Sequence, residues 1–191
     1  TLRILYVIDI IDRYSNQNEL FIQQAYAGLK LGFFTLMAGS WEENYGNQDN
    51  SISSGGVIWS GNARPIPQIS FATSGYIPVP FTKDFVELKG GISHGWFEDN
   101  QYNSDVWLHH KYLYLKFGGE QRVHLEYGLH HCAQWGGKSS NPDYGELPDD
   151  IKAFGKVFLG RGGGDDGPEE ETSNVIGNHI GSHNLALDFN G

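Results

Sequence analysis

The sequence is short of cysteine, since Cys132 is the only one among its 191 residues. A single cysteine excludes a disulfide within the chain, so the disulfide frameworks typical of small secreted domains give no guide to its compartment. We expect Cys132 to be a small packed side chain. Long apolar runs are missing as well: the longest covers residues 4–8, whereas a transmembrane helix needs about 18 residues. Helical membrane spans are therefore excluded, but membrane-crossing strands are not.

Positive charge is also scarce. The 13 Lys and Arg residues are outnumbered by 23 Asp and Glu residues, which gives a formal net charge of -10. Nucleic acids and anionic membrane surfaces attract clusters of Lys and Arg, so the composition argues against both as partners and leaves neutral or sugar ligands open. The 26 glycines and the aromatic content of 14% favour an all-β chain with many turns over a helical one.

The ends of the sequence carry no targeting signal. It begins at Thr1 without an initiator Met or a signal segment, and it stops at Gly191 just after a strand-like stretch. Its length does not require a second domain. We interpret residues 1–191 as one segment of a mature or partial chain that is incomplete at both ends.

Residues 122–135, RVHLEYGLHHCAQW, alternate strictly between two sets of side chains. A period of two is typical of a β-strand, whose side chains point to opposite faces in turn. The segment is long, because strands of soluble domains usually have about 5–6 residues and strands that cross a bilayer about 9–11. We predict a lipid-facing side with Val123, Leu125, Tyr127 and Leu129, and an interior side with Arg122, His124, Glu126 and His130.

Similar patterns predict eight strands, and the connections between them alternate between short and longer. The predicted strands are residues 1–12, 20–30, 33–41, 67–77, 85–97, 106–117, 122–135 and 180–189. Tight turns at one rim and large loops at the other are typical of a transmembrane antiparallel β-barrel with long extracellular loops. The two longest loops, 42–66 and 136–179, would then share the outward rim, where function usually lies.

Three short motifs suggest other chemistry, and each has a plainer interpretation. Residues 91–95, GISHG, match the nucleophile elbow of α/β-hydrolases but lie in a predicted strand rather than at a strand-to-helix turn. Residues 162–167, GGGDDG, match a dinucleotide-binding pattern but open no helix and would repel a pyrophosphate. Asp165 and Asp166 are weak candidates for a Ca²⁺ site, with a solvated acidic loop as the alternative. We predict no catalytic residue, no enzyme activity and no cofactor.

Two histidine pairs, 109–110 and 130–131, resemble metal ligands at first sight. Adjacent residues of a strand point to opposite faces, so neither pair can chelate as a unit. His110 and His130 can share a face across two strands if the register allows it. We interpret these histidines as strand residues in a polar barrel lumen or near an interface, and we predict no metal site.

The ligand-binding candidates combine position with residue type. Aromatic rings offer flat faces to sugar C–H groups, and Arg side chains match the carboxylates of acidic polysaccharides. Residues of both kinds lie in or beside the two longest loops, although such aromatics can also serve only to pack the loops themselves. The candidates are Trp59, Arg64, Tyr45, Trp135, Tyr144 and Arg161.

Several stretches in order resemble the Wzi capsule assembly family in its Bacteroidetes-type form. They include QQAYAGLKLGFFTLMAGSWEENYG, VELKGGISHGWFED, HLEYGLHHCAQWGG and NVIGNHIGSHNLALDF, and the resemblance covers about residues 20–190. It implies a bacterial outer-membrane β-barrel of about 18 strands that binds and anchors capsular polysaccharide at the cell surface. The family has no well-defined catalytic motif, so the resemblance transfers a role and no site residue.

The eight predicted strands are fewer than this resemblance requires. We therefore predict that residues 1–12 and 180–189 do not pair with each other, and that each meets a strand outside this chain. The expected partners are capsular or exopolysaccharide, outer-membrane lipid and other envelope proteins. The alternatives are an outer-membrane barrel of another role, porin-like or a subunit of a larger envelope complex, and a soluble β-sandwich lectin or an enzyme.

Overall fold

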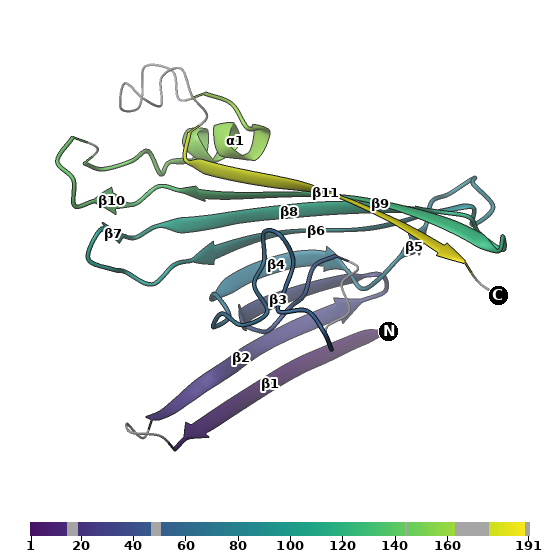
Figure 1. Ribbon diagram of the computed structural model, residues 1–191, viewed down its shortest axis with the longest axis horizontal. Helices are drawn as coiled ribbons and strands as arrows, with labels where there is room; N and C mark the ends of the chain where they lie inside the picture. Colours follow the sequence, from purple (N-terminus) through teal and green to yellow (C-terminus); the bar gives the residue numbers. More distant parts are fainter. Residues whose placement is uncertain (15–18, 47–50, 144, 163–175, 190–191) are drawn as a thin grey trace.

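The computed structural model describes residues 1–14, 19–46, 51–143, 145–162 and 176–189. Strands dominate this part of the chain, as the sequence predicted (Figure 1). In chain order the elements are β1 (Leu2–Arg13), β2 (Glu19–Leu31), β3 (Phe34–Ser40), β4 (Gln68–Thr73), β5 (Ile77–Pro78), β6 (Val86–Trp96), β7 (Asn103–Ser104), β8 (Trp107–Phe117), β9 (Val123–Trp135), β10 (Lys138–Ser139), α1 (Ile151–Leu159) and β11 (Asn178–Phe189).

The eight predicted strands are all present, with ends that differ by one or two residues in most cases. The exception is β4, which ends at Thr73 instead of residue 77. The stretch after it leaves the ladder at a bend and returns as the two-residue strand β5 beside β6. The GISHG motif lies inside β6, as expected, and not at a strand-to-helix turn.

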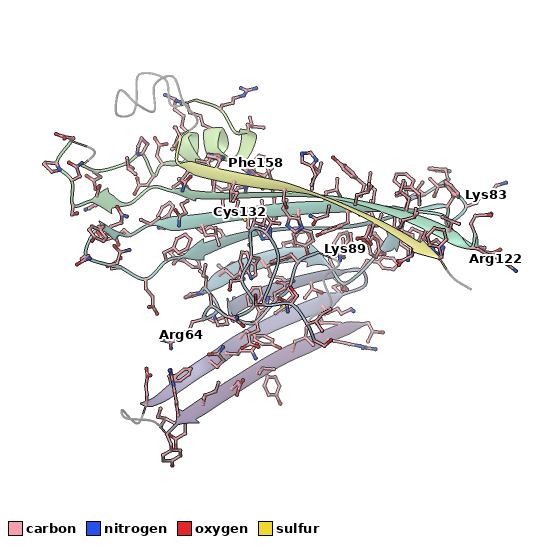
Figure 2. All side chains as sticks on the ribbon, in the orientation of Figure 1. Arg64, Lys83, Lys89, Arg122, Cys132 and Phe158 are labelled. Atoms are coloured by element: carbon pink, nitrogen blue, oxygen red, sulfur yellow. The ribbon has the colours of Figure 1, made fainter. Side chains whose placement is uncertain are left out.

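The long strands form one antiparallel sheet in the order β1-β2-β3-β4-β6-β8-β9-β11. Successive strands are neighbours, so the connections after β1, β3, β6 and β9 share one end of the sheet, the loop rim. The connections after β2, β4 and β8 share the other end, the turn rim; the one after β4 contains β5 and is longer than the sequence analysis expected. A small ladder between β7 and β10 joins two loop-rim connections. Figure 2 shows Lys83 and Arg122 at the turn rim, far from Phe158 of α1.

The two outer strands of the sheet do not meet. In the described residues, β1 pairs with β2 alone and β11 with β9 alone. This confirms that residues 1–12 and 180–189 do not pair with each other. Over the part of the chain that the structure describes, the sheet is therefore open, and both of its edges carry unpaired backbone groups.

The register gives the sheet an apolar face and a polar face. Leu113 pairs with Leu129, and both are exposed, whereas Tyr112 pairs with His130 on the other side. In β9, Val123, Leu125 and Leu129 are exposed, while His124 and His130 are buried. The predicted division into two faces is confirmed for the residues of β9, whereas Arg122, predicted on the interior side, lies just before the strand and is exposed. The buried polar residues of the polar face are Gln68, Ser70, Ser93, His110, His124 and His130.

Aromatic rings on the polar face lie directly over glycines of neighbouring strands. Tyr114 pairs with Gly128, and a Cβ on that glycine would meet the Tyr114 ring at 2.2 Å. Tyr112 covers Gly91 in the same way, at 2.9 Å. A glycine thus allows the ring to lie flat against the adjacent backbone, where a larger residue would push it away.

Helix α1 covers the apolar face at the loop rim, and its presence was not predicted. Ala153 and Val157, four residues apart and both buried, pack with Ala133, Trp135 and Ile176 in a small apolar cluster. Asp150 caps the N-terminus by accepting a hydrogen bond from the Ala153 amide at 2.7 Å. Gly160 ends the helix in the left-handed conformation, with φ 61°. No helix in the described residues is long and apolar enough to cross a membrane.

Two glycines should respond in opposite ways to alanine. Gly128→Ala forces the buried Tyr114 ring off its place and should lower the free energy of unfolding by about 1–3 kcal/mol. Gly155→Ala in α1 has open space around its Cβ and should raise it by about 0.5–1 kcal/mol through helix propensity. Urea unfolding of both variants measures the difference. An unchanged Gly128→Ala protein would show that the ring does not depend on the glycine.

Candidate binding site on the polar face

The connection between β3 and β4 turns back over the polar face of the sheet. We call its described residues, 41–46 and 51–66, the β3–β4 segment. Figure 1 shows it lying across the sheet instead of extending away from the loop rim. The rings of Tyr45 and Trp59 meet His110 of β8, at centroid distances of 4.5 and 5.2 Å. The sequence placed this connection on the outward rim but could not show that it folds inward.

A tight turn at residues 54–61 presents Trp59. The Gly56 amide donates to the Trp59 carbonyl at 2.8 Å, and the Gly61 amide donates to the Ser54 carbonyl at 2.7 Å. Gly55 adopts φ +133°, and a Cβ there would meet backbone atoms of Trp59 and Gly61 at 2.5 Å. Only glycine fits this position. The turn therefore fixes the backbone of Trp59, whose ring then stacks on His110.

Tyr45 anchors the segment to the sheet. Its ring is 8% exposed and contacts those of His110, Tyr112 and His130. Its hydroxyl donates to Glu43 Oε2 at 2.8 Å, and Trp41 Nε1 donates to the same oxygen at 2.8 Å. Burial, and then the Glu43 carboxylate, raise the pKa of Tyr45 well above its usual range. The phenol therefore stays protonated and holds the carboxylate in a fixed orientation.

Below Tyr45, a chain of polar side chains follows the polar face. His110 and His130 are linked through Nε2 and Nδ1 at 3.1 Å, and the Tyr114 hydroxyl is hydrogen-bonded to the other nitrogen of His130. The Lys89 ammonium lies 4.7 Å from the Tyr114 ring centre. The predicted sharing of a face by His110 and His130 is confirmed. No group of three or more His, Cys, Asp or Glu side chains in the described residues is arranged to hold a metal.

A cavity of about 490 Å³ lies between the β3–β4 segment and the ends of β8, β9 and β11. This volume is in the range of small-ligand sites. Aromatic rings, carboxylates and amides line it together. The lining residues with these groups are Trp41, Glu42, Glu43, Trp59, Gln134 and Asn178. Trp41, Glu43 and Gln134 were not among the predicted site residues, since nothing in their sequence pattern shows that the segment folds over β9.

The structure brings some of the predicted binding residues together and separates others. Trp59 and Arg64 line the cavity, and Tyr45 lies beneath Trp59. The Arg64 guanidinium stacks on Phe21 at 5.1 Å and makes a long 3.5 Å hydrogen bond to the Ile22 carbonyl, so its donors turn toward β2. Figure 2 shows Arg64 at the side of the sheet where β2 lies.

Other predicted residues lie apart from the cavity. Trp135 is buried on the apolar face beneath α1, where its ring contacts Trp107 and Phe154. Arg161 is exposed just after α1. Tyr144 lies outside the described residues, and so do Asp165 and Asp166, the weak Ca²⁺ candidates.

Removing the Tyr45 ring should release the β3–β4 segment. Tyr45→Ala loses the contacts with His110, Tyr112 and His130, so hydrogen exchange of peptides spanning residues 51–66 should speed up by about tenfold or more, which corresponds to ~1.4 kcal/mol. Tyr45→Phe keeps the ring and should show a smaller increase. Equal exchange in Tyr45→Ala and the unmodified protein would mean that the segment is held elsewhere.

Comparison with curated proteins gives no match, and comparison with solved structures gives none either. The sequence profile of the family described as "Capsule assembly protein Wzi" matches residues 5–191, which is nearly the whole chain. This chain therefore belongs to the Wzi capsule assembly family.

Proposed function

We propose that this chain is part of an outer-membrane β-barrel that binds capsular polysaccharide at the cell surface and holds a sugar unit beside Trp59. Family membership supports a role in capsule assembly and a place in the outer membrane. The observation that carries the ligand proposal is the cavity between the β3–β4 segment and the sheet, where aromatic rings lie next to carboxylate and amide groups. Sugars are bound by this combination, because their C–H faces stack on rings while their hydroxyls need polar partners.

The exposed apolar face supports the membrane location. Every long strand of the sheet has exposed large apolar side chains on this face, although β6 and β8 have fewer than the others. A soluble protein would bury such a surface. These exposed residues include Ile4, Ile8, Leu29, Leu36, Phe71, Leu113, Leu129 and Leu185. A soluble β-sandwich would cover this face with a second sheet, and the only other sheet in the described residues has two two-residue strands.

The free edges at β1 and β11 bear on how the barrel closes. Unpaired backbone N–H and C=O groups cannot face hydrocarbon, so a sheet in a membrane must close on itself. We infer that each edge pairs with a strand outside this chain, in a barrel wider than eight strands would form. The β3–β4 segment fills part of the polar face, which argues against the porin-like alternative because that face would line the channel.

The charges in the cavity indicate the kind of sugar. The sequence suggested arginine forks that bind the carboxylates of acidic polysaccharides, but the Arg64 donors are turned toward Phe21 and Ile22. The carboxylates of Glu42 and Glu43 line the cavity instead. A carboxylate on a bound sugar would be repelled by these two carboxylates. The cavity therefore suits an uncharged or amino sugar unit, whose hydroxyl or ammonium groups can donate to Glu43.

Loss of the Trp59 ring should weaken binding. Trp59→Ala should reduce the affinity for oligosaccharides cut from the capsule of the source strain by about tenfold, which corresponds to ~1.4 kcal/mol. Trp96→Ala is the matched control, because Trp96 is exposed on the opposite face. Isothermal titration calorimetry in detergent measures both. Unchanged affinity in Trp59→Ala would remove this cavity from the proposal.

The charge preference can be tested at Glu43 with little change of shape. Glu43→Gln can keep both hydrogen bonds from Trp41 and Tyr45 through its amide oxygen while removing the charge. The unmodified protein should bind carboxyl-reduced oligosaccharides several-fold more tightly than the same oligosaccharides with uronate groups, and Glu43→Gln should narrow that difference. The proposed preference for uncharged or amino sugars would be wrong if the unmodified protein bound the uronate form more tightly and Glu43→Gln bound the two forms with the same difference.

A further inference from the structure

Helix α1 lies on the apolar face of the sheet, on the side away from the β3–β4 segment. Its inner side is fully covered: Val157 is 0% exposed, and Phe154 contacts His94, His109 and Trp135. These residues share their face with the exposed Leu113 and Leu129, because the ladder between β8 and β9 has no register shift. The helix therefore lies on the same side of the sheet as the apolar band and next to it.

The apolar band ends at one level on both strands under the helix. On β9 the residues of this face are Leu125, Tyr127 and Leu129, followed by His131; on β8 they are Leu115 and Leu113, followed by Lys111. Lys111 pairs directly with His131, so the change from apolar to polar falls at the same register step. From this level up to the loop rim, α1 covers the sheet.

The C-terminal end of α1 lies at that boundary. The Lys111 ammonium donates to the Phe158 carbonyl, and it lies 4.0 Å from the Phe158 ring centre. Phe154, one turn earlier, contacts His94 and Trp135 near the rim. The helix thus runs from the loop rim toward the apolar band, and Figure 2 shows Phe158 between α1 and the strands.

The outward side of α1 carries large apolar residues beside Lys152 and Lys156, where a helix packed on a soluble protein would be polar throughout. Ile151 is 85% exposed and Leu159 is 58% exposed, and Phe158 is also partly exposed. Leu159 is eight residues after Ile151, so both lie on the outward side, and Phe158, whose ring also contacts His109, lies at the margin of that side. Leu159 and Phe158 are at the end nearest the apolar band. Their exposed surface therefore lies at the end of the helix that faces Leu113 and Leu129 along the strands.

We propose that α1 is an interfacial helix, which rests on the lipid leaflet at the loop rim with Leu159 and Phe158 at the boundary between headgroups and acyl chains. This inference rests on the proposed membrane location. Interfacial helices bury their apolar side by about 5–10 Å in this region. Here the helix already has its inner side fixed to the barrel, so α1 sets how far the strands sink into the leaflet. Lys111 marks the level of the membrane surface.

Depth-dependent fluorescence quenching tests the proposal. Single cysteines are placed at Leu159, Leu129 and Asn141 in the full-length protein with Cys132→Ala, labelled with a small polarity-sensitive dye and reconstituted into phospholipid vesicles. Separate vesicles contain lipids brominated near the headgroup or near the chain end. Leu129 reports membrane insertion, and Asn141, exposed in a loop of the same rim, reports water. We expect the label at 159 to be quenched at least about twofold more than that at 141, most strongly by the headgroup-proximal bromines.

The outcomes separate this inference from the proposed function. If the label at 129 is quenched while the label at 159 behaves like the one at 141, the interfacial helix is wrong and the membrane barrel still stands. Cross-linking at 159 would then show whether a second copy or another envelope protein covers the helix. A label at 129 that no brominated lipid quenches would overturn the membrane location, and the interfacial helix with it.

Discussion

The antiparallel register between β6, β8 and β9 is the constraint on which the other features depend. It aligns Tyr112 with His130 on one side and Leu113 with Leu129 on the other. A slip of one residue would exchange the two faces of a strand and would turn His110 and Tyr114 outward. The Tyr114 ring over Gly128 opposes such a slip, because no neighbouring residue of β9 leaves the same space for an aromatic ring.

The β3–β4 segment covers the polar face of the sheet and buries its histidines. His110 is almost completely buried there, and the hydrogen bond between its Nε2 and His130 Nδ1 offsets part of the cost of burying a polar side chain. The segment brings aromatic rings onto the histidines, and its own Glu43 carboxylate accepts hydrogen bonds from Trp41 and Tyr45. The segment and the sheet therefore cover each other, and the cavity beside Trp59 is the space left at their junction.

The strands could be read from the sequence because alternation is a local signal. The period of two is a property of the strand itself and does not depend on what the strand packs against. The ends of β6 and β9 were therefore predicted within about two residues. The period also allowed His110 and His130 to share a face, but the register between β8 and β9 was needed to decide it. Helix α1 was missed, although Asp150 and Gly160 are capping residues on either side of an apolar pattern. A helix of nine residues is a weak sequence signal, and the Gly- and Asp-rich composition of the long connection around it indicated a loop.

The site itself was less predictable, because it depends on contacts between distant residues. Tyr45 and Trp59 were named from their loop position, but no local pattern shows that the loop returns to β8. Trp135 was named for the same reason, yet it is the last residue of β9 and its parity places it on the apolar face. Applying the alternation of residues 122–135 to its last residue would have separated Trp135 from the loop aromatics.

Because of the same alternation, two adjacent residues of β8 contact different elements on opposite faces of the sheet at the loop rim. His109 packs under Phe154 and Phe158 of α1, while His110 packs under Tyr45 and Trp59. Strand β8 is thus held between α1 on one side and the β3–β4 segment on the other. Because both elements are fixed to the same few residues of β8, the proposed sugar cavity and the proposed membrane level are set at a constant distance from each other. A polymer bound at the cavity would then be held at a defined height above the lipid surface.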